Sequence, residues 1–171
     1  VNVTIKDNAT NAAENSSKIF SYSYTAAFDV HPSAISWPVL NPGQTNVYSI
    51  ENLTINNTGN VNFTAVNITA YNLSGVNNPS YYIPAENFYA SVNYGSCGLG
   101  TKLDDEKNVS IGSFNSLAPG NLSFNDGTAQ KEIFFCLIPV PSPLPFQTYS
   151  TSVGAPWEIM LYGIASFVIH K

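Results

Sequence analysis

The sequence has no arginine and little charge of either sign. Six lysines oppose eleven acidic residues among 171, charged residues make up only 10% of the chain, and the formal net charge is −5. That sign does not suit a phosphate backbone, so we expect no nucleic-acid partner. Because 44% of the residues are hydrophobic, the chain also lacks the low-hydropathy, high-charge composition of disordered proteins.

Long apolar segments are missing as well. No run reaches the roughly 18 apolar residues of a membrane helix, so we expect no membrane span in the chain. No segment combines a helical apolar period with helix caps, which excludes a coiled coil. The chain starts at Val1 rather than at a methionine, and we expect an export signal to have been removed.

Residues that commonly carry catalysis are scarce. The only histidines are His31 and His170. Metalloprotease, phosphate-loop and nucleophile-elbow motifs are absent from the sequence. Cys136 has no histidine close after it, as a blue-copper site would require. We therefore expect a protein that is not an enzyme and holds no cofactor.

One acidic cluster, Asp104, Asp105 and Glu106, could offer oxygen ligands to calcium. Adjacent residues cannot all face one ion without a tight turn, and Lys102 and Lys107 flank the cluster. We expect a solvated loop here, with a calcium site as the open alternative.

Asparagine is abundant, and its placement is informative. The chain holds 21 asparagines, and ten of them stand in the N-glycosylation sequence Asn-x-Ser/Thr. With this composition, chance would give about four such sequons. The excess indicates an exported glycoprotein, although a turn-rich β protein with much Asn, Ser and Thr remains an alternative. The ten are Asn2, Asn8, Asn15, Asn52, Asn56, Asn62, Asn67, Asn72, Asn108 and Asn121.

The middle residue of seven sequons is bulky and apolar, which gives the polar–apolar–polar alternation of a half-buried strand. Leu53 and Ile55 should therefore face a core. The apolar parity changes between Phe63 and Val66, and a β-bulge near Ala65 would return both to the core side. The sequon asparagines would then lie on the outer faces of the strands.

Two cysteines suit one disulfide in an oxidising compartment. We expect Cys97 to be bonded to Cys136, and a pair of free buried thiols is the alternative. In the loop-entropy model, closing about 40 residues is worth roughly 4 kcal/mol.

Turn signals recur at short intervals and separate segments rich in β-formers. Pro139, Pro141, Pro143 and Pro145 alternate, so that piece should be an extended arm or an edge. The segment from Trp157 to Ile169 is apolar on both faces and should form a central strand. The fold class is all-β, an antiparallel β-sandwich. The expected strands cover residues 19–30, 45–56, 61–73, 87–94, 108–115, 130–138 and 157–169.

The N-terminal end differs from the rest. Val1, Val3 and Ile5 alternate with polar residues, as in a short one-sided strand. The polar stretch from Asp7 to Ser17 then reads as a linker far longer than a hairpin needs. We divide the chain into a tail, residues 1–18, and a head, residues 19–171. An ordinary first strand that crosses the sandwich is the alternative.

Together, the tethered strand, the polar linker, the sequons and the apolar C-terminal strand resemble pilins that polymerise by donor-strand complementation. The character is most similar to subunits of archaeal thread filaments. The segments 40–44 and 57–60 also resemble patterns of archaeal surface Ig-like domains and camelysin-like biofilm-matrix proteins. The resemblance implies an Ig-like or pilin-like sandwich that accepts a neighbour's N-terminal strand. Type IV-like filament subunits need a long apolar N-terminal helix, which is absent.

We therefore expect a glycosylated, extracellular filament subunit used for adhesion or biofilm, with identical subunits as its partners. The donor residues would be Val1, Val3 and Ile5, with Trp157–Lys171 as the next candidate. The alternative is a secreted, monomeric carbohydrate-binding sandwich or a glycoprotein of the cell-surface layer. In that alternative, some of the ten tyrosines and ten phenylalanines would stack against sugars.

Overall fold

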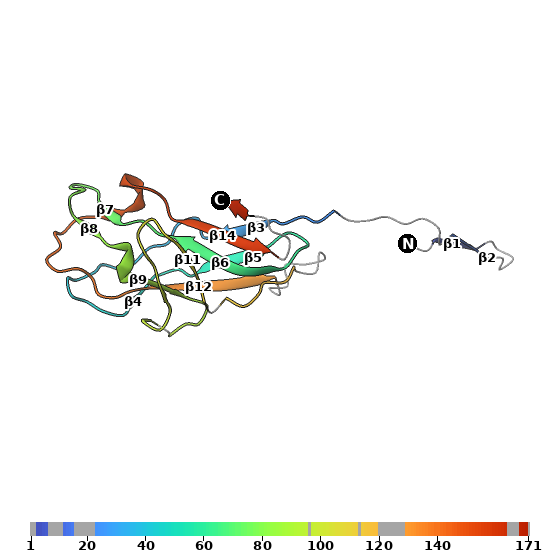
Figure 1. The fold of residues 1–171 in the computed structure, drawn as a ribbon, viewed down its shortest axis with the longest axis horizontal. Helices are drawn as coiled ribbons and strands as arrows, with labels where there is room; N and C mark the ends of the chain where they lie inside the picture. Colours follow the sequence, from blue (N-terminus) through green and yellow to red (C-terminus); the bar gives the residue numbers. More distant parts are fainter. Residues whose placement is uncertain are drawn as a thin grey trace.

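Two antiparallel sheets pack face to face in an all-β sandwich (Figure 1), as the alternating sequence predicts. The computed structural model describes residues 3–6, 12–15, 23–95, 97–112, 114–119, 129–163 and 168–170. None of the helices in these ranges is long and apolar enough to cross a membrane. The helical content described consists of two short 3₁₀ turns, η1 (Ala85–Asn87) and η2 (Thr151–Val153).

The larger sheet has six strands, with β12 at its centre. Their order is β10 (Thr101–Lys102), β9 (Phe88–Ser91), β12 (Gln130–Leu137), β5 (Leu53–Asn57) and β3 (Phe28–His31), and β4 (Val47–Tyr48) also pairs with β12.

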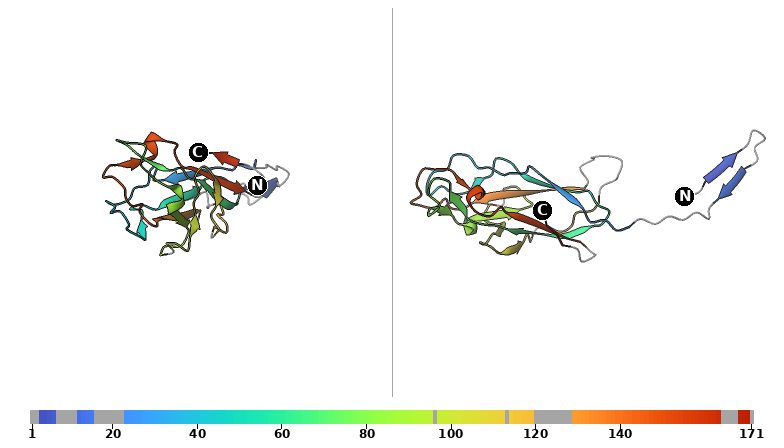
Figure 2. Two further views of the ribbon diagram at one scale, coloured as in Figure 1. Left: turned by 60° about the vertical axis from the view of Figure 1, so that its left-hand side comes forward. Right: turned by 90° about the horizontal axis from the view of Figure 1, so that it is seen from above.

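The facing sheet has four strands, and a small third sheet lies at one end of the molecule (Figures 1 and 2). The four are β11 (Asn108–Ser110), β6 (Phe63–Thr69), β14 (Glu158–Gly163) and β15 (Val168–His170). The small sheet holds β13 (Tyr149–Ser150), β7 (Leu73–Gly75) and β8 (Tyr82–Ile83).

The core lies between the two large sheets and takes alternate residues from each. Leu53, Ile55 and Ile133 face it from one side, and Val66 and Ile68 from the other. The rings of Phe28 and Phe63 meet edge to face across the core at 6.0 Å. An aromatic group of Trp37, Phe88, Phe135 and Trp157 fills a further part of it.

The bulge predicted near Ala65 is confirmed. Tyr162 pairs with Ala65, but Gly163 pairs with Phe63, so Thr64 is the extra residue on β6. Because of this insertion, Phe63 and Val66 are both fully buried although they are three residues apart. The proline-rich arm also follows the prediction, since no strand occurs between residues 138 and 148.

The predicted single strand over residues 157–169 is wrong. The segment forms two strands, β14 and β15, which pair antiparallel with each other. β14 lies between β6 and β15. Two adjacent residues of β14, Met160 and Leu161, are both buried, so both faces of the strand are covered. Burial on both faces made the segment resemble one long strand, because an apolar pattern does not show where a chain reverses.

The predicted strand 130–138 agrees with β12 to within one residue, whereas the other predicted strands are shorter or divided in the structure. The run 45–56 divides into β4 and β5, which pair with successive parts of β12. Short strands β7, β8, β10 and β13 were not predicted. They contain only two or three residues each, too few for an alternating pattern to be visible.

Candidate functional site

The sequon asparagines in β5 and β6 and directly before them lie on the solvent side. Leu53, Phe63 and Ile68, the middle residues of three sequons, are all buried. Their neighbouring asparagines point the other way because successive residues of a strand face opposite sides. Asn62 is exposed, and Asn52, Asn56 and Asn67 are half-buried, so all four retain access to solvent.

Two sequon asparagines from neighbouring strands touch each other. The Asn67 Nδ2 on β6 donates a hydrogen bond to the Asn108 Oδ1 on β11. Met160 on β14 pairs with Asn67 on β6, and the Asn108 Nδ2 lies 3.4 Å from the Met160 Sδ. Asn67 and Asn108 therefore share one small patch on the outer face of the four-stranded sheet.

Asn72 has a structural role in addition to its sequon. Its Nδ2 donates to the Asp105 Oδ2 at 2.7 Å, and its backbone N–H donates to the Asp105 Oδ1 at 3.1 Å. Its Oδ1 accepts from the backbone N–H of Ala85 at 2.8 Å. The half-buried side chain thus connects three separate segments.

Asn57 shows what a purely structural asparagine looks like in this fold. Asn57 does not begin an N-glycosylation sequon, and the residue is only 4% exposed. Its Nδ2 donates to the carbonyls of Val61 and Leu117 at 2.8 and 3.1 Å, and its Oδ1 accepts from Gly59 N–H. The sequence analysis did not identify Asn57, because its partners lie up to 60 residues away.

The remaining sequons fall at the ends of the described ranges or beyond them. Asn15 is the last residue of β2 (Ala12–Asn15). Asn2, Asn8 and Asn121 lie outside the described residues, as does Val1 of the predicted donor strand.

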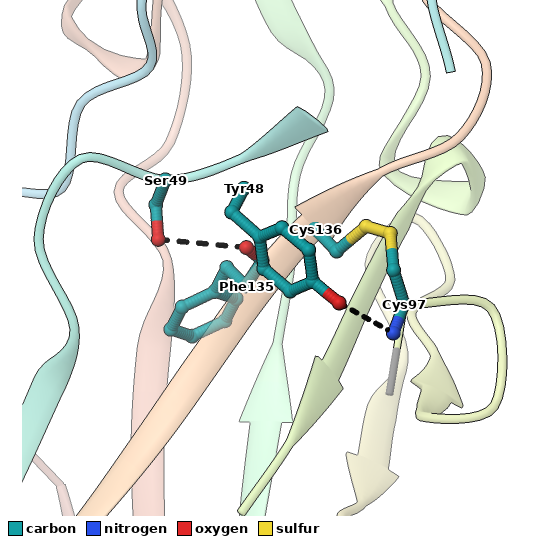
Figure 3. The surroundings of a disulfide bond; sticks show 5 residues. All are labelled: Tyr48, Ser49, Cys97, Phe135 and Cys136. Carbon is teal, nitrogen blue, oxygen red and sulfur yellow. Dashed lines mark hydrogen bonds between the residues drawn. A yellow bond between two sulfur atoms is a disulfide. The ribbon is translucent and has the colours of Figure 1, made fainter. Parts of the chain in front are cut away.

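The predicted disulfide between Cys97 and Cys136 is confirmed. It links the loop after β9 to the central strand β12, whose Cys136 is almost completely buried. The backbone N–H of Cys97 also donates to the Tyr48 hydroxyl at 2.8 Å (Figure 3). Both cysteine-containing segments are therefore fixed against β4 and β12.

The acidic cluster lies in the loop between β10 and β11. The Lys107 ammonium forms an ion pair with Asp104, and its hydrogen bond holds the pKa of Asp104 below the ordinary value. Asp105 is committed to Asn72, and Glu106 is exposed with a φ of 58°. The three carboxylates thus have separate surroundings, and the described residues contain no cluster of His, Cys, Asp or Glu suited to a metal ion.

The N-terminal strand exists, but the linker prediction needs correction. β1 (Val3–Lys6) pairs antiparallel with β2, so residues 12–15 of the expected linker form a strand. In this pair, Val3 lies opposite Asn15 at one end and Lys6 lies opposite Ala12 at the other. The segment Ala-Ala-Glu-Asn carries no typical β-former, which is why its composition predicts a linker. The tail–head boundary at residues 18 and 19 lies outside the described residues.

The β1–β2 pair lies apart from the sandwich (Figures 1 and 2). Among the described residues, the segment that leads into the sandwich is first bonded to it at Ser23 and Thr25. The Asn60 Nδ2 donates to the Ser23 carbonyl at 2.8 Å, and the Thr25 N–H donates to the Asn60 Oδ1 at 2.7 Å. β1 thus has β2 as its strand partner, and no pairing with a sandwich strand is present among the described residues.

No protein-family model, curated protein or solved structure shows a significant match to this chain.

Proposed function

We propose that this chain is a structural subunit of an extracellular, glycosylated filament that assembles head to tail through its N-terminal strand. The observation that carries the proposal is the β1–β2 pair, which lies apart from the sandwich (Figure 1). A two-stranded hairpin alone is at best marginally stable in water. Its strand edges can gain further backbone hydrogen bonds by pairing with another sheet.

Strand addition to a second copy would meet that need. Val3 and Ile5 occupy alternate positions of β1, which share one face of a strand. Burying each of these aliphatic side chains is worth roughly 1.5–3 kcal/mol. Ladder hydrogen bonds add about 0.5–1.5 kcal/mol each. Because donor and acceptor are different surfaces, each added subunit would leave a new acceptor free, and the chain of contacts would stay open.

The outward position of the sequons supports the glycosylated and extracellular parts of the proposal. Six sequon asparagines with described surroundings retain access to solvent, and their apolar neighbours on β5 and β6 supply the core. Glycans on these asparagines, with one at a time on the touching pair Asn67 and Asn108, would cover the outer faces of the sheets without disturbing the packing between them. The disulfide is in keeping with an oxidising location. Adhesion or biofilm formation is the use that we propose for such a filament.

The proposal is tested by placing charges on either face of β1. In Val3→Asp/Ile5→Asp, unpaired carboxylates would have to be buried at the junction, so we expect monomers where the unmodified chain gives filaments. The matched control, Thr4→Asp/Lys6→Asp, changes the other face and should still assemble. Negative-stain imaging and size-exclusion chromatography read the outcome. Filaments of normal length from the first variant would contradict a donor role for β1.

A further inference from the structure

Three aromatic rings form a cluster on the outer face of the six-stranded sheet. They belong to Tyr48 on β4, Phe134 on β12 and Tyr94 in the loop after β9. The Tyr94 ring centroid lies 5.0 Å from that of Tyr48 and 5.5 Å from that of Phe134. Tyr94 rests on the other two and is 71% exposed, so one large ring is offered to solvent. We call these three residues the aromatic platform.

Tyr48, on which Tyr94 rests, is held in position by a hydrogen bond next to the disulfide. The Tyr48 hydroxyl accepts a hydrogen bond from the backbone N–H of Cys97, which is in turn bonded to Cys136 on β12 (Figure 3). Next to Tyr94, the Asn93 N–H donates to the Ser91 Oγ at 3.0 Å. A surface fixed in this way loses little conformational freedom when a ligand binds.

The surface beside the platform is formed by uncharged residues. They include Tyr48, Tyr89, Asn93 and Phe134. The charged residues nearest by strand position are Lys102, opposite Tyr89, and Glu132, two residues before Phe134. Their opposite signs favour neither an anionic nor a cationic ligand, so a neutral one fits best.

The size of the platform limits what can occupy it. A whole aromatic side chain presents about 150–250 Å². Because Tyr48 and Phe134 are already half-buried, the platform offers at most a few hundred Å². A stable protein interface needs roughly 800 Å² on each partner. A flat, exposed ring with amide and hydroxyl groups beside it instead suits a sugar ring, which has an apolar C–H face and a polar rim.

We propose that the aromatic platform binds a neutral polysaccharide, with one pyranose ring stacked on Tyr94. Asn93 and the tyrosine hydroxyls beside the platform would bond to the sugar hydroxyls. This activity is independent of filament assembly, since the platform lies on the sandwich and does not involve β1.

Biosensor surfaces that carry biotinylated polysaccharides test the proposal with the full chain. The probes are a mannan, an α-glucan and a β-1,3-glucan, with alginate as the anionic comparison. We expect binding to at least one neutral probe, and Tyr94→Ala should weaken it by about tenfold or more. Tyr94→Trp keeps a stacking ring and should retain the binding. Tyr24→Ala removes a tyrosine that is 83% exposed and outside the platform, and it should bind like the unmodified chain.

Several outcomes would overturn the proposal. They are the absence of binding to every neutral probe, binding to alginate alone, and equal binding by Tyr94→Ala and the unmodified chain. Because Tyr94 is an exposed loop residue, its replacement should leave the melting temperature nearly unchanged. Imaging of the same variants separates this result from assembly, since Tyr94→Ala should form filaments whenever the unmodified chain does.

Discussion

Two adjacent asparagines of β5, Asn56 and Asn57, have different structural roles. Asn56 and Asn57 are adjacent in β5, and only Asn57 faces inward, where its amide is bonded to three backbone groups. Replacing Asn57 by Ala removes the side-chain donor of the buried Val61 carbonyl and one of the two donors of the Leu117 carbonyl, which also accepts from the Phe63 N–H. We expect a loss of roughly 2–4 kcal/mol in the free energy of unfolding. Asn56→Ala is the matched control and should stay within about 0.5 kcal/mol. Denaturant unfolding gives both values, and equal losses would refute the distinction.

The contact between Asn67 and Asn108 predicts competition for glycans. Their amides touch on the sheet surface, so a sugar on one occupies the space needed by a sugar on the other. Ser110→Ala removes the sequon of Asn108 and leaves its side chain in place. We expect the glycan occupancy of Asn67 to rise in this variant, as measured by glycopeptide mass spectrometry. Asn62 has no such neighbour described, and its occupancy should not change. An unaltered value at Asn67 would rule competition out.

Sequence alternation was enough to predict which residues of β5 and β6 face the core, because burial repeats every second residue in a strand. It was not enough to identify asparagines with structural bonds. Asn57 and Asn72 each depend on a partner far away in the sequence, Leu117 for one and Asp105 for the other. The same holds for the aromatic platform, whose rings come from three separate segments.

At the scale of elements, the bulge in β6 was predictable because the apolar parity changes within one strand. The reversal between β14 and β15 was not, since both sides of the turn are apolar. The pairing of β1 with β2 was also not predictable. The sequence of β2, Ala-Ala-Glu-Asn, contains no alternating apolar pattern, so nothing in it indicates a strand that pairs with β1.

Deleting Thr64 tests the role of the bulge. Without the extra residue, Phe63 or Val66 must leave the core face of β6, although both are fully buried. We expect a loss of roughly 3–5 kcal/mol in the free energy of unfolding, comparable with removing a core phenylalanine. Thr64→Ala keeps the residue count and should cost less than about 1 kcal/mol. Thermal or denaturant unfolding compares the two. A deletion as mild as the substitution would mean that β6 can shift its register without harm.

For the whole molecule, the distribution of charge matters more than its total. The ion pair described in the structure, Lys107 with Asp104, is exposed at both ends. Its hydrogen bond lowers the pKa of Asp104 from 3.8 and raises that of Lys107 from 10.5. The contribution from Asp104 is therefore present above pH 3.8 and is lost as the pH falls through the lower folded value. The contribution from Lys107 is present below pH 10.5 and is lost as the pH rises through its higher folded value. Solvent screening keeps both small.

The exposed position of the Lys107–Asp104 pair bears on how pH and salt affect the stability of the fold. No buried ion pair among the described residues has to be broken by acid or salt, and the apolar core between the sheets does not titrate. We expect the melting temperature to change by less than about 3 °C between about pH 7 and about pH 4, in the unmodified chain and in Lys107→Ala alike. A calorimetric scan at each pH measures it, and a steep fall above pH 4 would contradict the expectation. Acid, brine and their fluctuations would then leave the sandwich intact while they alter the charge on its surface.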